Sequence, residues 1–276
     1  MRLWHGNRMS NAVADIATTK TVAKAMRILH AFSNAEPELS VGELSARLGM
    51  HKSIVSRLVT SLAEWRMVER DPVTKRIRLG LGALQLGMLV ANQNPIHRLA
   101  LPLLGSLVEK TRHTAHVSTR DHHSMLVMAS VLSPDALRVT LQLGDRRPLH
   151  AAAAGKIFLA HLSEDQLRSF IAEAGLQALT DETITKPKEL ASQLATIRRF
   201  GIAWNIGESA VGVGAVAAPV MSAEGAVVAA VSSVFPLTLV RTPDRHFIAE
   251  HVRRTARELS IALGWNESSE VKGSKK

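Results

Sequence analysis

Apolar residues recur at helical spacing over the first third of the chain and predict three short helices. The first is expected over residues 21–33, with an apolar stripe of Val22, Ala25, Met26, Leu29 and Phe32. The second follows Ser40-Val41-Gly42-Glu43, where a hydroxyl and a carboxylate three residues apart match a capping box. It ends at Gly49-Met50, and the third spans residues 51–65, with its inner face expected from Val55, Leu58, Leu62 and Trp65.

Two short basic segments after these helices are expected to pair as strands. They cover residues 67–70 and 76–79, and the string Asp71-Pro72-Val73-Thr74-Lys75 between them is typical of a turn. A connecting helix is expected over residues 81–91, and Asn92-Gln93-Asn94-Pro95 breaks it. The pattern therefore predicts a small domain at residues 20–80 and a linker helix at residues 81–95.

The remaining pattern mixes both periodicities and predicts one α+β domain around a central sheet, over residues 96–265. The expected helices cover residues 97–112, 152–161, 164–174, 188–200 and 243–263. The expected strands cover residues 115–119, 125–132, 137–143, 202–205, 214–220 and 227–234. Residues 1–19 and 266–276 are expected to be a disordered arm and tail.

Composition narrows the class of protein. The chain has 276 residues, 46% of them apolar, which suits two folded domains rather than a disordered chain. The absence of cysteine excludes disulfides and thiolate metal sites. No continuous apolar stretch resembles a signal peptide, and the apolar segment 212–235 is interrupted by Pro219, Glu224 and Gly225, so two buried strands are expected there. A cytoplasmic protein is the expectation.

Charge is concentrated near the start of the chain. Residues 1–90 carry 13 Lys or Arg against 7 Asp or Glu, so they hold +6 of the total net charge of +10. A basic N-terminal domain favours a polyanionic partner, and double-stranded DNA is the leading candidate.

The third helix and the basic hairpin have the features of a winged helix-turn-helix. A helix that enters the major groove needs a slim N-terminal end and side chains that reach phosphates or base edges. The predicted DNA-binding residues are Lys52, Ser53, Ser56, Arg57 and Thr60 on the helix, and Lys75, Arg76 and Arg78 on the hairpin. His51 is expected to be a capping or surface residue rather than a base reader. The alternative is a three-helix interaction module whose basic face is merely solvated.

The order of these elements, and several local strings, resemble the IclR family of bacterial transcriptional regulators over residues 19–265. The strings are Val22–Phe32, Leu39–Leu48, Gly49–Ser53, Ser56–Leu58, Leu79-Gly80, Gly144, Pro148–His150, Gly155-Lys156, Leu159-Ala160, Arg199–Ala203, Glu208, Ala217–Val220, Gly225 and Val227–Ser232. The resemblance implies a linker helix and a C-terminal, GAF-like effector-binding domain. It also implies homodimers, or tetramers built as dimers of dimers, that bind palindromic operators and respond to small organic, often aromatic, acids.

The resemblance further implies an effector pocket in the C-terminal domain. Its implied residues are Val139, Leu141, Ala152, Ala153, Ala154, Asn205, Ala217, Ser232 and Val234. Small residues at a helix start let a ligand approach free N–H groups, although close helix–sheet packing demands the same composition. The chain departs from the family pattern at Asn205-Ile206-Gly207, where acidic residues are frequent, and at Arg147, where Leu is common. Arg146 and Arg147 indicate either an anionic effector or ordinary surface arginines.

Other motifs lead to no enzyme, cofactor or metal prediction. Residues 151–156 lack the first glycine of a P-loop, and the glycines at 212–214 lead into a strand rather than a helix. No Gly-x-Ser-x-Gly string is present. The group His113, His116, His122 and His123 is a weak metal candidate. The competing function is an enzyme built on the C-terminal domain, with the N-terminal helices serving assembly.

Overall fold

The computed structural model describes residues 20–266 and divides the chain into two compact units, one ending at Val90 and the other beginning at Ala91. The predicted disordered arm, residues 1–19, and the predicted tail from residue 267 onward lie outside the described residues. Within residues 20–266, no helix has the length and apolar character needed to span a membrane.

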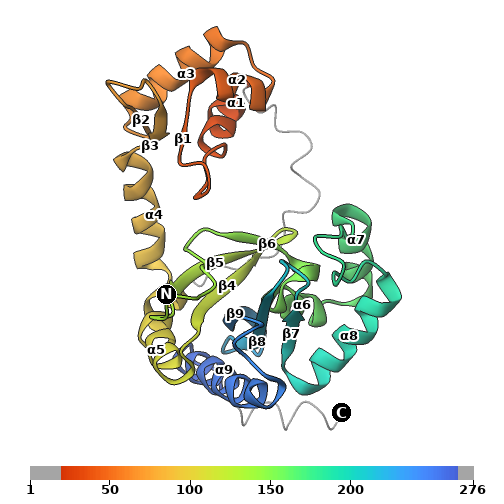
Figure 1. Ribbon diagram of the computed structural model, residues 1–276. Helices are drawn as coiled ribbons and strands as arrows, with labels where there is room; N and C mark the ends of the chain where they lie inside the picture. The colour runs from red at the N-terminus through yellow and green to blue at the C-terminus, as the bar shows by residue number, and fades with distance from the viewer. Residues whose placement is uncertain (1–19, 267–276) are drawn as a thin grey trace. The chain divides into compact units, whose positions relative to one another are not determined.

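The first unit consists of helices packed on a small antiparallel sheet (Figure 1). Its elements are α1 (Lys20–Leu29), β1 (Glu38–Leu39), α2 (Val41–Leu48), α3 (Lys52–Glu64), β2 (Val68–Arg70) and β3 (Ile77–Leu79). The sheet order is β1-β3-β2. The strand β1 is not among the predicted strands. Leu39 is buried and pairs with Ile77, so this two-residue strand joins the start of α2 to the hairpin.

Local chemistry explains the ends of α2. The backbone N–H of Glu43 donates to Ser40 Oγ at 3.2 Å, and the backbone N–H of Ser40 donates to Glu43 Oε2 at 2.6 Å, which confirms the predicted capping box. Gly49 ends the helix with a φ of 62°, a left-handed conformation that glycine adopts without steric cost.

Part of the predicted inner face is wrong. Val22 and Met26 are exposed, and Trp65 is 79% exposed because it follows the last turn of α3, beyond the packed core. The prediction for Val55 is confirmed, and the core combines it with Ile28, Leu44, Val59, Val68 and Ile77. Spacing predicts which residues lie on helices, but only the position of the sheet, which contributes Val68 and Ile77, decides which helix face is covered.

The second unit is a six-stranded antiparallel sheet with helices on both faces (Figure 1). The linker helix α4 (Leu81–Gln93) crosses the boundary between the units. The sheet order is β6-β5-β4-β9-β8-β7. The strands are β4 (Thr114–Asp121), β5 (Ser124–Val131), β6 (Arg146–Pro148), β7 (Ala203–Ile206), β8 (Val213–Met221) and β9 (Val227–Pro236). The helices are α5 (Pro95–Thr111), η1 (Leu149–Ala151), α6 (Ala153–Ala160), α7 (Glu164–Ala174), α8 (Pro187–Phe200) and α9 (Thr242–Ala262).

Alternation along the strands gives the sheet two buried faces. One face packs with α5 and α9 and includes Val117, Val216 and Val231. The other packs with α6, behind which α7 and α8 lie, and includes Val127, Ala215 and Ala230. Gly155 lets α6 approach η1 closely, because a Cβ there would lie 2.2 Å from the carbonyl oxygen of Leu149.

The predicted strand over residues 137–143 does not form. Its carbonyl groups accept hydrogen bonds from side chains instead, from Thr114 Oγ1 to Val139 O at 2.7 Å and from Ser130 Oγ to Leu141 O at 2.6 Å. The strand that extends the sheet is β6, which pairs with β5 and was not predicted. The irregular segment therefore lies against the sheet without joining its ladder.

Candidate functional site

The N-terminal half of α3 presents the predicted polar face. Lys52, Ser53, Arg57 and Thr60 are exposed, and Ser56 is half-buried. Within residues 20–266, neither Lys52 nor Arg57 forms an ion pair. The two cations are therefore available to an external anion.

The start of α3 is shaped by a histidine cap. The N–H of Ser53 donates to His51 Nδ1 at 3.4 Å, and the same ring nitrogen lies 2.9 Å from Ser53 Oγ. Of the two roles expected for His51, this is the capping role. Further along, Thr60 Oγ1 donates to the carbonyl oxygen of Ser56 at 3.0 Å, so the Thr60 hydroxyl lies against the helix surface.

The cations of the β2–β3 hairpin are largely engaged within the unit. Arg76 donates to Glu38 O at 2.8 Å and to Glu43 Oε2 at 3.1 Å, and Arg78 donates to Glu69 Oε2 at 3.3 Å. Lys75 donates to the carbonyl oxygen of Pro72 at 2.7 Å. The hairpin therefore offers less free positive charge than the residue count in the sequence indicates.

Glu43 connects the hairpin to the helix-turn-helix. Its carboxylate accepts the capping hydrogen bond from Ser40 and also pairs with Arg76. The backbone hydrogen bond from Ser40, followed by the contribution of Arg76, lowers the pKa of Glu43 below its ordinary value. Glu43 is thus held in the charged form that fixes the hairpin to α2.

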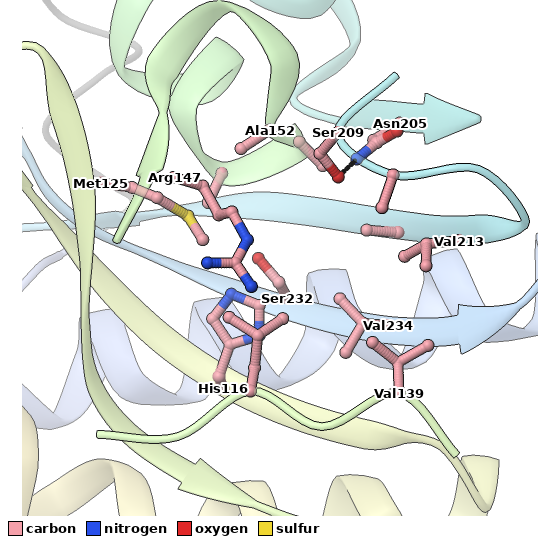
Figure 2. Close-up of a pocket in the computed structure, with 15 residues that line it drawn as sticks. His116, Met125, Val139, Arg147, Ala152, Asn205, Ser209, Val213, Ser232 and Val234 are labelled. Carbon is pink, nitrogen blue, oxygen red and sulfur yellow. Dashed lines mark hydrogen bonds between the residues drawn. The ribbon is translucent and has the colours of Figure 1, made fainter. Parts of the chain in front are cut away.

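The second unit contains a cavity of about 70 Å3 on the α6 face of its sheet (Figure 2). Every residue predicted for the effector pocket lines it except Ala217. Sequence reasoning assigned eight of the lining residues, namely Val139, Leu141, Ala152, Ala153, Ala154, Asn205, Ser232 and Val234. It did not assign the other lining residues, namely His116, Met125, Arg147, Ser209, Ala210, Val213 and Ala215.

Strand register brings the cavity residues together. His116 on β4 pairs with Ser232 on β9, and Val234 on β9 pairs with Ala215 on β8. Asn205 on β7 in turn pairs with Ala215. These pairs form two adjacent rows across the sheet, and the start of α6 lies above them.

Ala217, which the family resemblance implied as a pocket residue, does not line this cavity. Ala217 pairs with Ser232 and with Ala203, but it is fully buried in the apolar cluster around α6 and does not border the cavity. Ala215, two residues earlier on the same face of β8, lines the cavity instead. Both positions share a side of the strand, so periodicity could not choose between them.

Two buried polar side chains in the cavity lack protein partners. His116 is 2% exposed and Ser232 is 1% exposed, and neither the ring nitrogens of His116 nor the hydroxyl of Ser232 has a hydrogen-bond partner within the described residues. Burial, followed by the charge of Arg147, lowers the pKa of His116 to about 4, although Asp145 opposes this shift. The neutral ring offers one donor and one acceptor to a ligand.

Sequence signals for the missed residues were weak. His116 resembles Ser232 as a polar residue in an apolar strand, but it was grouped with neighbouring histidines as a metal candidate. The structure separates that group: His113 stacks near Phe235, while His122 is exposed and His123 lies near Phe170. Within residues 20–266, no group of His, Asp and Glu side chains could hold a metal ion.

A buried ion pair supports one side of the cavity. Lys156 Nζ of α6 lies 2.6 Å from Glu208 Oε1, in the loop that follows β7. The Glu208 N–H donates to Asn205 Oδ1 at 2.8 Å, and Asn205 Nδ2 donates to Ser209 Oγ at 2.7 Å. Burial lowers the pKa of Lys156 and raises that of Glu208, and each partner's charge opposes the shift. The pair ties the start of α6 to the loop that carries Ser209 and Ala210.

Two family models match the chain. "IclR helix-turn-helix domain" matches residues 21–72, and "Bacterial transcriptional regulator IclR C-terminal" matches residues 88–261. One match lies in each unit, and residues 73–87, which include β3 and the first part of α4, fall between the two matched regions.

Individual relatives match over almost the whole length. The chain is 30% identical to the HTH-type transcriptional repressor AllR of Escherichia coli K12 over 89% of this chain and 90% of AllR. An IclR regulator structure from Alicyclobacillus acidocaldarius is similar with a TM-score of 0.80 and 27% identity, covering 89% and 99% of the two chains. An IclR homologue from Microbacterium hydrocarbonoxydans, complexed with 4-hydroxybenzoate, has a TM-score of 0.77 at 23% identity, over 88% and 98%. The matched models and named relatives are transcriptional regulators and not enzymes.

Proposed function

The chain belongs to the IclR family of bacterial transcriptional regulators, and from this we propose that it is a ligand-responsive regulator of catabolic genes that senses a small organic acid. It acts as a repressor or an activator by binding operator DNA through α3 and the β2–β3 hairpin, in the cytoplasm. The observation that carries the proposal is the combination, within residues 20–266, of two features: two cations on α3 that form no ion pair, and a largely apolar cavity in the second unit that holds buried polar side chains.

The DNA contacts are divided between helix and hairpin. Lys52 and Arg57 reach phosphates or guanine edges, while Ser53 and Ser56 keep the entering end of α3 slim. Lys75, in the turn of the β2–β3 hairpin, contacts the phosphate backbone of the DNA. Arg76 and Arg78 contribute only where phosphate competes with Glu43 and Glu69 for their guanidinium groups.

The ligand is a small acid because the cavity is small and has, among residues 20–266, no acidic lining residue. One water requires about 10–15 Å3 of such space, so a cavity of about 70 Å3 accepts only a compact molecule. The relative that binds 4-hydroxybenzoate shares the fold and supports an acid in general.

A homodimer presents two copies of α3 to the two halves of a palindromic operator. Two such dimers pair into a tetramer. The support for dimerisation is the linker helix α4, whose apolar side chains are exposed on all sides, namely Leu81, Leu84, Leu86, Met88, Leu89 and Val90. A second copy of this helix would cover them. Sedimentation equilibrium tests the dimer, and Leu84→Glu is expected to shift it toward monomer.

The DNA-binding role is tested by gel shift on the DNA upstream of the chain's own gene. We expect Arg57→Ala to weaken binding about tenfold, because one base or phosphate contact contributes roughly 1–3 kcal/mol. Lys110→Ala, which removes the same charge from an exposed position of α5, is the matched control and should bind normally. Unchanged affinity of Arg57→Ala at matched salt would show that α3 is not the recognition helix. No shift by the native protein, even at low salt, would refute the regulator itself.

The sensing role is tested separately with Ser232→Leu. The larger side chain occupies the cavity, so DNA binding should persist while the response to metabolite extracts disappears. A normal response in this variant would place the effector elsewhere.

A further inference from the structure

We propose that Arg147, His116 and Ser232 form an anion-binding subsite that selects a carboxylate group of the effector. The proposal rests on the proposed function and assigns the ligand's charged group to particular residues. Figure 2 shows the Arg147 guanidinium directed into the cavity, toward the ring of His116 and the side chain of Ser232. These groups come from β6, β4 and β9, three separate strands of the sheet.

Arg147 is oriented but not neutralised. Its Nη1 donates to the carbonyl oxygen of Arg146 at 2.7 Å, which fixes the direction of the side chain. Within residues 20–266, it has no ion pair and no other hydrogen bond, so Nε and Nη2 are available to a ligand. A guanidinium that presents two N–H groups in one plane matches the two oxygens of a carboxylate.

His116 and Ser232 complete the subsite because both are buried without partners. A buried polar group that lacks a hydrogen bond is costly, so an occupied state in which a ligand oxygen meets these atoms is favoured. The two residues are directly opposite each other on β4 and β9, and their side chains therefore approach the same point.

Nearby carboxylates do not compete for the site. Among residues 20–266, no acidic side chain lines the cavity. Asp145, which precedes β6, accepts a hydrogen bond from the backbone N–H of Gln142 at 2.9 Å. The charged groups that act on His116 are thus Arg147 and, more weakly, Asp145. A bound carboxylate would bring the missing negative charge between Arg147 and the imidazole.

Arg146 provides a matched control for Arg147. It is the preceding residue on the same strand, but it is exposed and pairs with Asp121. Replacing either arginine with leucine removes one charge from β6, and only Arg147→Leu removes it from the cavity. Arg147 is only partly buried, and leucine is smaller and uncharged, so the fold should accept it.

The test uses the full-length protein, with formate as the probe and formamide as its neutral isostere. The His116 ring resonances are assigned in NMR spectra by comparison with His116→Gln, and each probe is titrated at constant ionic strength. We expect formate to shift the His116 signals saturably in the native protein and in Arg146→Leu, and formamide to have no effect. In Arg147→Leu, formate should bind at least about tenfold more weakly, because a charge-assisted hydrogen bond is lost. Arg147→Lys should retain part of the affinity.

Removal of the cation should also raise the pKa of His116 before any ligand is added. An unchanged pKa in Arg147→Leu, equal effects of formate and formamide, or no response of the native protein to formate would each overturn the subsite. A gel shift on the same preparations separates this failure from failure of the proposed function. DNA binding with no formate response refutes only the subsite, whereas absence of DNA binding refutes the regulator.

Discussion

Replacing Lys156 with methionine should destabilise the second unit strongly. Lys156 is completely buried and pairs with Glu208, which is only 6% exposed. Methionine fills a similar volume but leaves the Glu208 carboxylate buried without its cation. Removal of one partner of a buried pair costs about 3–5 kcal/mol, most of it the penalty of the remaining charge.

The same reasoning predicts how pH changes this cost. Burial already raises the pKa of Glu208, and the loss of Lys156 raises it further. In the variant, the folded protein tolerates Glu208 while its carboxyl is protonated at low pH. The free energy of unfolding falls as the pH rises toward the raised folded-state pKa, because ionisation of the carboxyl is favoured in the unfolded chain but opposed by burial. The destabilisation by Lys156→Met should therefore be larger at about pH 8 than at about pH 5.

Urea unfolding followed by tryptophan fluorescence measures this change when Trp4, Trp65 and Trp265 are replaced by phenylalanine, because the signal then comes from Trp204 on β7, in the same unit as the pair. The control is a double-mutant cycle with Glu208→Leu. The loss in the free energy of unfolding of the double variant should be smaller than the summed losses of the two single variants, by more than about 1 kcal/mol. A cost of Lys156→Met below about 1 kcal/mol, with additive effects in the cycle, would refute the view that this pair supports the cavity.

Three further predictions concern stability. His116 has a pKa lowered from 6.5 to about 4, so the stability from its neutral form is complete above pH 6.5 and is lost as the pH falls toward 4. Protonation of His116 alone should lower the free energy of unfolding by about 2 kcal/mol as the pH falls from about 7.5 to about 5. The variant His116→Gln should lack this part of the pH dependence in urea titrations. Gly155→Ala should cost about 1–3 kcal/mol, since the new methyl group meets the Leu149 backbone; an unchanged melting temperature would contradict this packing. Ser40→Ala should cost about 1 kcal/mol in the unfolding of the first unit, and Ser40→Gly less, if the capping box acts as described.

Local chemistry was readable from the sequence where it depends on a few adjacent residues. The capping box at Ser40, the left-handed turn at Gly49 and the histidine cap at residue 51 require only the geometry of one or two helix ends. Helices α7 and α8 and strands β7 to β9 were also predicted close to their observed bounds, because their periodicity is strong. The choice of a transcriptional regulator followed from the order of these elements together with the family resemblance.

Other features depend on residues that are distant in the sequence. The irregular path of residues 137–143 results from hydroxyl groups of Thr114 and Ser130, which occupy carbonyl oxygens that a strand would otherwise pair. The engagement of Arg76 and Arg78 likewise depends on carboxylates brought near by β1 and α2.

The amino-acid sequence by itself determined the helix ends, the basic character of the first unit and most small residues around the cavity. Only the tertiary structure decided that His116 and Arg147 face the cavity and that Ala217 does not. The physical reason is register: alternation along a strand assigns a side chain to one face, but pairing with β9 and coverage by α6 determine its neighbours on that face. Those neighbours make Arg146 a surface residue and place Arg147, the next residue, in the lining of the cavity.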